Sequence, residues 1–419
     1  MTRTLDVYLF ADFVGRLVQD DGGQMVFDYS DGWLTSGRAA PLSQSLPLRE
    51  KRYRNKECRG FFAGVLPEES KREIIARNLG ISARNNYAML ERIGGECAGA
   101  VTFMSAGQAL PAREPGYRTL SQEELVAIIR ELPLRPLLAG EKGVRLSLAG
   151  AQDKVAVRVE DGEISLPLGN APSTHILKPA VERFEGVVHN EAFCMKLAAA
   201  AGLPTAPVEI GSVEGLHYLL VERYDRHHSI GPNGAQFVER LHQEDFCQVL
   251  GIVSEHKYQK EGGPTLKQCF GLIRSVSSAP VLDLRHLLDA VIFNWLVGNN
   301  DAHGKNFSLL YTGIGTGRVE TRLAPLYDIV CTVAYPELSG EMAMRIGDQY
   351  SSERVTPKDF EKLSEDAGLR NPLVKRRVSE FAEVLLEKLP LVDAGNPAAE
   401  KVASILRRRA EAARMSFVR

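Results

Sequence analysis

The sequence predicts an α+β fold whose first half is rich in strands and whose C-terminal part is mostly helical. Up to about residue 225, apolar residues occur in short alternating runs that Gly and Asp turns separate, as is typical of antiparallel strands. From about residue 240, longer apolar runs with helix caps dominate. A chain of 419 residues is long enough for two or three domains, and we expect regions 1–110, 111–225 and 226–419.

The composition is that of an ordinary globular protein. Hydrophobic residues make up 44% of the chain and charged residues 25%, which excludes disordered, collagen-like and coiled-coil proteins. The net charge of −2 leaves no whole-chain field that would attract nucleic acid or an anionic membrane. The six cysteines show no CxxC pair and no zinc-ligand spacing, so we expect free thiols in a reducing compartment.

No segment resembles a signal peptide or a membrane span. The N-terminal apolar run Val7–Ala11 is too short for a signal sequence, and the longest uncharged stretch, Cys97–Ala112, is full of Gly, Ser and Gln. We therefore expect a cytoplasmic protein without a membrane partner.

The first 110 residues predict a meander followed by a helix. Alternating runs on either side of the turn at 20–23 indicate strands, and a helix is expected at 68–78 with Gly80 as its stop. The basic segment Arg49–Arg59 is either a solvated loop or a contact for an acidic partner or DNA.

The middle region combines a linker, a helix and several strands. Pro111–Tyr117 reads as a linker, and Ser121 with Glu124 forms a capping box that starts a helix. The remaining predicted elements are a small-residue loop at 147–154, two strands joined at Asp161-Gly162, a strand ending in Lys178, a helix at 189–202 and a strand at 217–226.

The last region predicts helices and one hairpin. We expect helices at 242–251, 266–276 and 283–298, a Gly-rich hairpin turn at 312–317, a helix opened by Thr356-Pro357, and two further helices.

The strongest chemical signal is the segment "NNDAHGKN" at 299–306. Asp301 and Asn306 have the D-x-x-x-x-N spacing of a kinase catalytic loop, in which a carboxylate accepts the attacking hydroxyl's proton and an amide oxygen binds Mg²⁺. Asp328 in "LYDIV" is placed to be a second metal ligand, and His303 could contact a phosphate. The alternative is that Asp301 makes an Asx turn after a helix. A Walker A loop is excluded, because the spacing is wrong and a helix precedes it.

Three features upstream fit the same chemistry. Lys178 could hold the α/β-phosphates, with Glu191 on the next helix as its ion-pair partner. Ser147–Ala151 is small enough for backbone N–H groups to approach phosphate oxygens, and Glu222–Asp225 could face an adenine. Each also has a plain alternative: a solvent-facing strand residue, an ordinary turn and an ordinary strand end.

Together the motifs resemble one family. In order they are "SLAGAQDK", "HILKP", "NEAFCMKLAAAAGLP", "LLVERYDR", "QEDFCQVLG", "GNNDAHGKNFSLL" and "LAPLYDI". They are similar to the HipA family of bacterial serine/threonine kinases, which are toxins of type II toxin–antitoxin modules. The resemblance covers about residues 145–330 densely, and the strand-rich N-terminal region is also similar.

The resemblance implies a bilobal protein-kinase-like fold with an additional N-terminal subdomain, an ATP-binding lobe at 111–225 and a catalytic lobe at 226–419. It implies Mg²⁺ and ATP as cofactors. The implied roles are Asp301 as catalytic base, Asn306 and Asp328 as magnesium ligands, Lys178 as phosphate lysine, Glu222 and Tyr224 at the adenine, and Leu148, Ala149, Gly150, Ala151 and Gln152 over the nucleotide. Ser147 would be the autophosphorylated serine, whose modification expels the loop and switches the kinase off.

The resemblance also implies targets and partners. The targets would be aminoacyl-tRNA synthetases such as glutamyl-tRNA synthetase, whose phosphorylation inhibits translation and induces dormancy. The partner would be a HipB-like helix-turn-helix antitoxin, with operator DNA contacted indirectly through it. Two alternatives stay open, namely a small-molecule kinase on the same scaffold and a non-catalytic corepressor. A neighbouring gene for a helix-turn-helix protein would favour the toxin.

Overall fold

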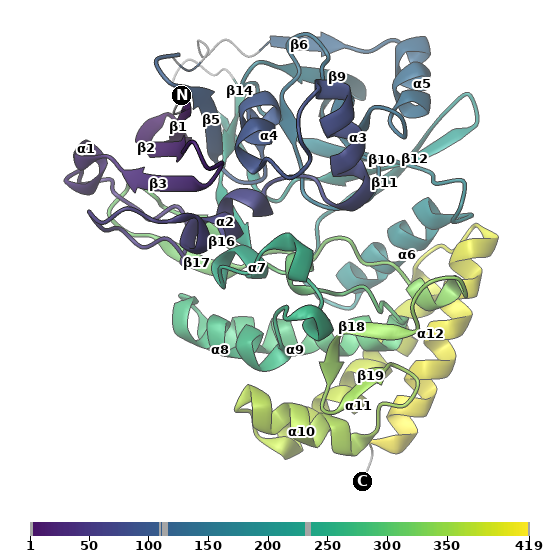
Figure 1. Cartoon of the computed structure of the whole chain (residues 1–419). Coiled ribbons are helices and arrows are strands. Elements are labelled where there is room, and N and C mark those ends of the chain that lie inside the picture. The colour runs from purple at the N-terminus through teal and green to yellow at the C-terminus, as the bar shows by residue number, and fades with distance from the viewer. Residues whose placement is uncertain (1–2, 109, 111–115, 231–235, 418–419) are drawn as a thin grey trace. The chain divides into compact units, whose positions relative to one another are not determined.

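A computed structural model describes residues 3–108, 110, 116–230 and 236–417 of the chain (Figure 1). The chain divides into two compact units. Unit 1 consists of Met1–Pro179, Gly211–Glu255 and Leu310–Glu320, and unit 2 of Ala180–Ile210, His256–Leu309 and Thr321–Arg419. The predicted three-part division at residues 110 and 225 stays a prediction.

The first sheet of unit 1 is the expected antiparallel meander with one added strand. Its order is β3-β2-β1-β5, with β1 at Arg3–Leu9, β2 at Asp12–Gln19, β3 at Met25–Tyr29 and β5 at Val101–Ser105. The turn at 20–23 is confirmed, and Gly23 adopts the positive φ of 78° that the turn needs. A tighter turn at Phe10, which the sequence does not predict, separates β1 from β2.

Four helices lie along the chain between β3 and β5. They are α1 (Asp31–Leu34), α2 (Asn55–Gly64), α3 (Glu69–Leu79) and α4 (Asn86–Ile93). The predicted helix at 68–78 is confirmed as α3, and Gly80 ends it in the left-handed conformation. Phe62 of α2 packs against Phe27 and Phe103 of the sheet, with ring centroids 5.2 and 5.9 Å away. This aromatic contact joins the helices to the sheet.

A six-stranded sheet carries the central part of unit 1, in the order β11-β12-β10-β8-β9-β6. Its strands are β6 (Gly116–Thr119), β8 (Val155–Glu160), β9 (Glu163–Leu168), β10 (His175–Pro179), β11 (Val208–Val213) and β12 (Leu216–Glu222). The β8–β9 hairpin at Asp161-Gly162 and the strand that carries Lys178 are confirmed. Because β10 lies between β8 and β12, Lys178 is on an interior strand.

Shorter elements complete unit 1. They are β4 (Glu96–Cys97), paired in parallel with β7 (Leu146–Ser147), α5 (Gln122–Glu131), η1 (Pro136–Leu138), β13 (Arg226–Ile230), β14 (Gln236–Arg240), β15 (His242–Asp245), α7 (Phe246–Val249) and η2 (Ser254–His256). The predicted Ser121 capping box opens α5.

Two sequence predictions in this unit need correction. Residues 111–115 of the expected linker lie outside the described residues, but Gly116 and Tyr117 already belong to β6. The expected helix at 242–251 is wrong in its first half, because His242–Asp245 is strand β15 and α7 has only four residues. Both errors come from reading local pattern where sheet pairing decides the conformation.

Unit 2 is mostly helical, as expected. Its helices are α6 (Val187–Ala200), η3 (Gln259–Glu261), α8 (Leu266–Val276), α9 (Pro280–Val297), η4 (Gly304–Asn306), η5 (Thr332–Ala334), α10 (Pro357–Ala367), α11 (Asn371–Lys388), η6 (Leu389–Leu391) and α12 (Pro397–Ser416). Figure 1 shows α8 to α12 gathered together. Helix α9 is rich in apolar residues and is buried without interruption from Leu287 to Val297.

Two short hairpins follow α9 along the chain. One consists of β16 (Ser308–Thr312) and β17 (Glu320–Leu323), as predicted from the Gly-rich turn between them. With β15 these two strands form a three-stranded sheet in the order β15-β16-β17, and residues Leu310–Glu320 belong to unit 1. The other consists of β18 (Glu341–Ile346) and β19 (Gln349–Ser351). The α+β class, with strands early and helices late, is confirmed.

All six cysteines are free and buried, as expected from their spacing. Among the residues that the structure describes, no helix is both long and apolar enough to cross a membrane.

Candidate functional site

The segment 299–306 begins at a helix end that requires glycine. Helix α9 stops at Val297, and Gly298 caps it in the left-handed conformation with φ of 75°. A Cβ atom at this position would lie 2.4 Å from a methyl group of Val333. Glycine therefore allows the chain to turn sharply out of α9 while packing against Val333.

Hydrogen bonds from three other segments fix the path of 299–306. The backbone N–H of Asn300 donates to the Thr332 hydroxyl at 2.8 Å, and its carbonyl accepts from the N–H of Ala343 at 2.7 Å. Near the other end, the Tyr327 hydroxyl donates to the carbonyl of Lys305 at 2.7 Å. The loop is therefore a rigid support for side chains.

Asn306 and Asp328, the two predicted magnesium ligands, lie side by side. The Asn306 Nδ2 atom is 3.4 Å from both the carbonyl oxygen and Oδ2 of Asp328. Asn306 is 7% exposed, and among the described residues its Oδ1 atom has no hydrogen-bond partner. A buried acceptor without a donor is costly unless a ligand satisfies it. An amide oxygen beside a carboxylate is a donor set that suits Mg²⁺, so these residues fit the implied metal.

The backbone at Asp328 is itself unusual. Its φ is 59°, a left-handed conformation that few residues other than glycine adopt. Asn190 of α6 holds the following turn, because its side chain accepts from the N–H of Cys331 at 2.8 Å and donates to the carbonyl of Cys331 at 3.1 Å. The Asp328 carboxylate is thus aimed by a backbone that α6 keeps in place.

Asp301, the predicted base, is exposed, unlike Asn306. Its Oδ1 atom accepts a hydrogen bond from the hydroxyl of Tyr258 at 2.8 Å. The Tyr258 ring also packs edge-on against His303, with centroids 5.5 Å apart. Tyr258 was missed at the sequence level, because it lies 43 residues before Asp301 in a segment without a recognisable motif.

In unit 1, the predicted autophosphorylation serine is buried. Ser147 is 0% exposed, its β7 strand pairs with β4, and its hydroxyl donates to the carbonyl of Val65 at 2.8 Å. Any phosphoryl transfer to this hydroxyl requires that the segment first leave its place against Val65.

The loop after Ser147 is fastened to α3 and to the segment that precedes it. Gly150 forms a bridge to Pro67, and Lys71 pairs with Asp153 at 2.6 Å. Both side chains of this ion pair are mostly buried, at 16% and 10% exposed. Lys154 folds back so that its Nζ atom donates to the carbonyl of Ala149 at 2.7 Å. These contacts thus hold in place the loop that contains the six residues expected at the nucleotide: Ser147, Leu148, Ala149, Gly150, Ala151 and Gln152.

Lys178 is 5% exposed and sits opposite Leu219 of β12. The alternative reading of Lys178 as a solvent-facing strand residue is therefore wrong. Its predicted partner Glu191 is on α6 and 1% exposed. The two residues belong to different units, so their pairing stays a prediction.

The predicted adenine segment follows β12. Glu222 is the last residue of that strand, paired with His175, and the hydroxyl of Tyr224 donates to the side-chain oxygen of Gln243 at 2.7 Å. Arg223 and Asp225 alternate with these two residues and are 4% exposed each. The buried side chains of Arg223 and Asp225 therefore anchor the segment.

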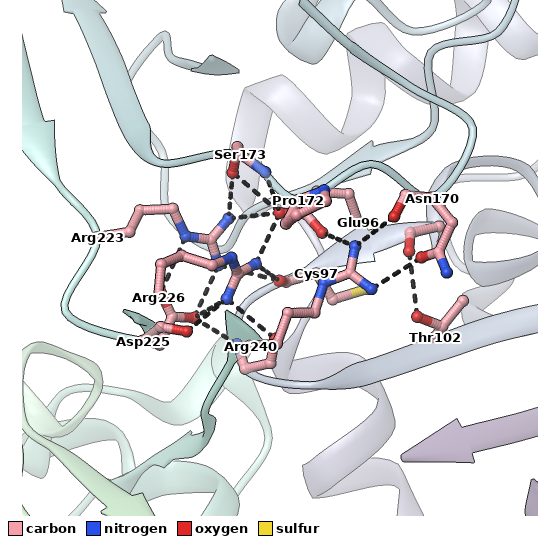
Figure 2. Close-up of polar contacts among 12 residues, drawn as sticks. Glu96, Cys97, Thr102, Asn170, Pro172, Ser173, Arg223, Asp225, Arg226 and Arg240 are labelled. Atoms are coloured by element: carbon pink, nitrogen blue, oxygen red, sulfur yellow. Dashed lines mark hydrogen bonds and ion pairs between the residues drawn. The ribbon is translucent and has the colours of Figure 1, made fainter. Parts of the chain in front are cut away.

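Figure 2 shows the anchor, an ion cluster around Glu96 that we call the Glu96 cluster: Glu96, Arg223, Asp225, Arg226 and Arg240. Glu96 accepts from Arg226 at 2.6 Å, from Arg223 at 3.2 Å and from Arg240. Asp225 pairs with Arg223 at 2.7 Å and with Arg226 at 3.0 Å. The cluster ties β4 to the segment 222–225 and to the base of the β13–β14 hairpin.

The arginines control the ionisation of Glu96. Burial by itself would raise the pKa of this carboxyl, but the charges of Arg226, Arg240 and Arg223 outweigh it and hold the pKa well below its ordinary value. Because Glu96 lies more than 120 residues before its partners, the sequence does not predict their contact. The alternation of charges in "ERYDR" marks only the Arg223, Asp225 and Arg226 side of the cluster.

The basic segment Arg49–Arg59 is less open than a solvated loop. Tyr53 is 2% exposed, and the Arg49 guanidinium lies 3.5 Å from its ring centroid. Arg49 also pairs with Glu57 at 2.6 Å, and Arg59 with Glu255 at 2.5 Å. Arg49 and Arg59 are thus paired within the chain, whereas the other four basic residues of the segment are exposed: Lys51, Arg52, Arg54 and Lys56.

Two family models match the chain. Residues 5–104 match a model described as the HipA N-terminal domain, and residues 146–389 match one described as the HipA-like C-terminal domain. Together these matches cover the strand-rich region, the nucleotide loop and the segment 299–306.

Known proteins similar to the chain agree with these models. A Sinorhizobium fredii protein named "Putative kinase Y4mE" is 47% identical over 396 residues, covering 93% of this chain and 92% of its own length. The serine/threonine-protein kinase toxin HipA of Shewanella oneidensis is 31% identical, covering 93% and 91%. The solved complex of Shewanella oneidensis HipA, HipB and operator DNA contains a chain that matches with a TM-score of 0.84 and 26% identity, covering 98% and 97%.

Proposed function

The chain belongs to the HipA family of kinases, and from this premise we propose that it is a Mg-ATP-dependent serine/threonine protein kinase. It would act as the toxin of a toxin–antitoxin module and phosphorylate a protein target. Autophosphorylation of Ser147 would be its off-switch.

The observation that carries this proposal is the arrangement of three side chains in unit 2. The exposed carboxylate of Asp301 is reachable by a substrate, whereas the buried Asn306 amide lies beside the Asp328 carboxylate. Phosphoryl transfer needs both kinds of group, an accessible proton acceptor and a fixed set of oxygen ligands for Mg²⁺.

Each residue would have a defined part in the reaction. Asp301 would accept the proton of the attacking hydroxyl, whose oxygen forms a bond to the γ-phosphorus as the bond to the β-phosphate oxygen breaks and ADP leaves. Asn306 and Asp328 would hold Mg²⁺, which would neutralise phosphate charge. His303 would contact a phosphate, and Lys178 would bind the α/β-phosphates.

The remaining roles concern nucleotide binding. Glu222 and Tyr224 would contact the adenine from a segment that the Glu96 cluster holds rigid. The loop of residues 147–152 would cover the phosphates with its backbone N–H groups. Its closed form buries Ser147 completely, so modification would require the open form.

We also propose a biological setting for this kinase. A HipB-like helix-turn-helix antitoxin would be the protein partner and operator DNA would be contacted through it, because the similar Shewanella oneidensis chain was solved with HipB and operator DNA. The protein target would be an aminoacyl-tRNA synthetase such as glutamyl-tRNA synthetase.

The test is intact-mass analysis of the purified chain incubated with Mg-ATP, beside Ser147→Ala and Asp301→Asn variants. We expect one added phosphate on the parent and none on Ser147→Ala. Asp301→Asn should slow incorporation by roughly 10²–10⁴-fold, because the base that orients the hydroxyl is lost.

An unchanged rate in Asp301→Asn would contradict the assignment of the base. If the parent, first shown to be unphosphorylated, gains no phosphate but still turns over ATP with added small hydroxyl compounds, a small-molecule kinase replaces the proposal. If the parent neither gains phosphate nor turns over ATP, the non-catalytic corepressor replaces the proposal.

A further inference from the structure

Tyr258 contacts two residues of the proposed catalytic loop at once. Its hydroxyl donates to Oδ1 of Asp301 at 2.8 Å, and its ring meets the His303 ring edge-on at 5.5 Å. A carboxylate on an exposed loop can rotate about its side-chain bonds, and each rotation would move the proton-accepting oxygen. The Tyr258 donor on Oδ1 restricts this rotation.

The turn that carries Tyr258 is built to be rigid. The Tyr258 carbonyl accepts from the N–H groups of both Glu261 and Gly263, each at 2.9 Å. A Cβ atom at Gly263 would lie 2.4 Å from the carbonyl oxygen of His256, so glycine is needed to close this turn. Gly262 adds a positive φ of 96°.

The same β-hairpin supports this turn and the catalytic loop. Gln259, next to Tyr258, accepts from the N–H of Arg345 at 3.0 Å, and Lys260 pairs with Glu341 at 2.6 Å. Both partners are on β18, the strand whose Ala343 donates to the carbonyl of Asn300 at 2.7 Å. Strand β18 therefore contacts both the turn that carries the Tyr258 hydroxyl and the loop that carries the Asp301 carboxylate, and all of these segments belong to unit 2.

We propose that Tyr258 is a positioning residue for the phosphoryl-transfer reaction, and that its hydrogen bond holds the Asp301 carboxylate in the orientation that accepts the proton of the attacking hydroxyl. This inference rests on the proposed kinase function. It assigns Tyr258 no contact with the reacting atoms. The rate of proton removal at a bound substrate depends on this geometry, whereas nucleotide affinity does not.

The test uses the Tyr258→Phe variant of the full chain, which keeps the ring against His303 and removes the hydroxyl. The rate of phosphate incorporation at saturating Mg-ATP, followed by intact mass, should fall about tenfold because a hydrogen bond to a charged group is lost. The ATP concentration that gives half the maximal rate should not change. Tyr350→Phe is the matched control, because Tyr350 is on β19 and its ring packs against Lys260 of the same turn.

A double-variant cycle separates positioning from a general structural effect. If Tyr258 acts through Asp301, then Asp301→Asn with Tyr258→Phe should be no slower than Asp301→Asn alone. A parent-like rate in Tyr258→Phe, a raised half-saturating ATP concentration, or a further tenfold loss in the double variant would each overturn the inference. If the Asp301→Asn variant incorporates phosphate at the parent's rate, the proposed role of Asp301 as the base is wrong. Comparison of this single variant with the parent shows that failure independently of Tyr258.

Discussion

Exposure distinguishes the polar residues of the segment 299–306 from one another. Asp301 is exposed, whereas Asn306 is buried with its Oδ1 atom free of any donor among the described residues. A proton acceptor has to be reachable by a protein substrate, and a metal ligand gains from a shielded position where charge interactions are stronger. The exposure of Asp301 therefore fits its proposed role as the base, and the burial of Asn306 fits its proposed role as a magnesium ligand.

At the residue scale, we predict that Asp328→Ala weakens Mg-ATP binding by roughly 10–100-fold, because one charged oxygen ligand beside Asn306 is lost. Titration calorimetry with Mg-ATP measures this change. With EDTA present, ATP should bind the parent and the variant equally, since no metal remains to be held.

The control for this prediction is Asp348→Ala, which removes an exposed carboxylate of the same unit. It should bind Mg-ATP like the parent. Equal Mg-ATP affinity in Asp328→Ala and the parent would remove Asp328 from the proposed metal site.

At the element scale, the loop after Ser147 is held closed by an ion pair from α3. The Lys71–Asp153 pair is mostly buried, so removing Lys71 would leave Asp153 with an uncompensated charge in the closed form. In the proposed open form of the loop, water would hydrate Asp153 and this cost would be absent. Lys71 would therefore favour the loop position that the structure shows.

We predict that Lys71→Met raises amide hydrogen exchange in residues 148–154 by roughly tenfold and speeds phosphate incorporation at Ser147. Hydrogen-exchange mass spectrometry measures the first effect and intact mass the second. Lys362→Met, which breaks only exposed pairs on α10, is the matched control. Unchanged exchange in Lys71→Met would mean that the ion pair does not hold the loop.

A second prediction at this scale concerns the Glu96 cluster. Glu96→Gln leaves three buried arginines with one carboxylate among them, so it should lower the free energy of unfolding of unit 1 by about 3–5 kcal/mol. Glu57→Gln removes an exposed partner of Arg49 and should cost less than about 1 kcal/mol. Thermal unfolding of both variants checks the contrast, and equal midpoints would show that the cluster contributes little.

At the scale of the whole molecule, a buried carboxyl makes stability depend on pH. Glu244 accepts hydrogen bonds from the Ser43 hydroxyl at 2.5 Å, the Gln44 N–H at 3.0 Å and the Tyr311 hydroxyl at 2.5 Å. Burial raises the pKa of Glu244 to about 7, against the lowering effect of these hydrogen bonds. Between its ordinary value and 7, the folded chain therefore holds a proton that the unfolded chain releases, and stability falls as pH rises.

His242 has the opposite effect on the pH dependence of stability. Burial lowers the pKa of His242 to about 4, so between pH 4 and 6.5 the unfolded chain takes up a proton that the folded chain does not. Its contribution to stability rises with pH and offsets that of Glu244. The parent should therefore show a weak pH dependence from these two groups.

We predict that Glu244→Gln removes the contribution of Glu244 to the pH dependence of stability and leaves that of His242. Gln matches the protonated carboxyl in shape, so the variant should be close to the parent near pH 4.5 and gain up to about 1.4 kcal/mol relative to it per pH unit towards pH 7. Thermal unfolding midpoints across this range measure the difference. A difference that does not change with pH would show that Glu244 is ionised throughout.

The sequence by itself determined much of this molecule, because its signals are local. Gly80 and the Ser121 capping box end and begin helices through backbone groups within a few residues, and both are where the sequence predicts them. The α+β class and the family motifs follow from the same short patterns. The Asp301–Asn306 spacing predicted a pair that the structure holds on one loop.

The tertiary structure alone decided which distant residues meet. Glu96 lies more than 120 residues before its arginines, and Tyr258 lies 43 residues before Asp301, so no local pattern marks either contact. The segment 242–245 reads as helix but pairs as a strand, because sheet hydrogen bonds outweigh its weak helical preference. Burial of Ser147 and the unsatisfied oxygen of Asn306 likewise depend on what packs around them, which only folding fixes.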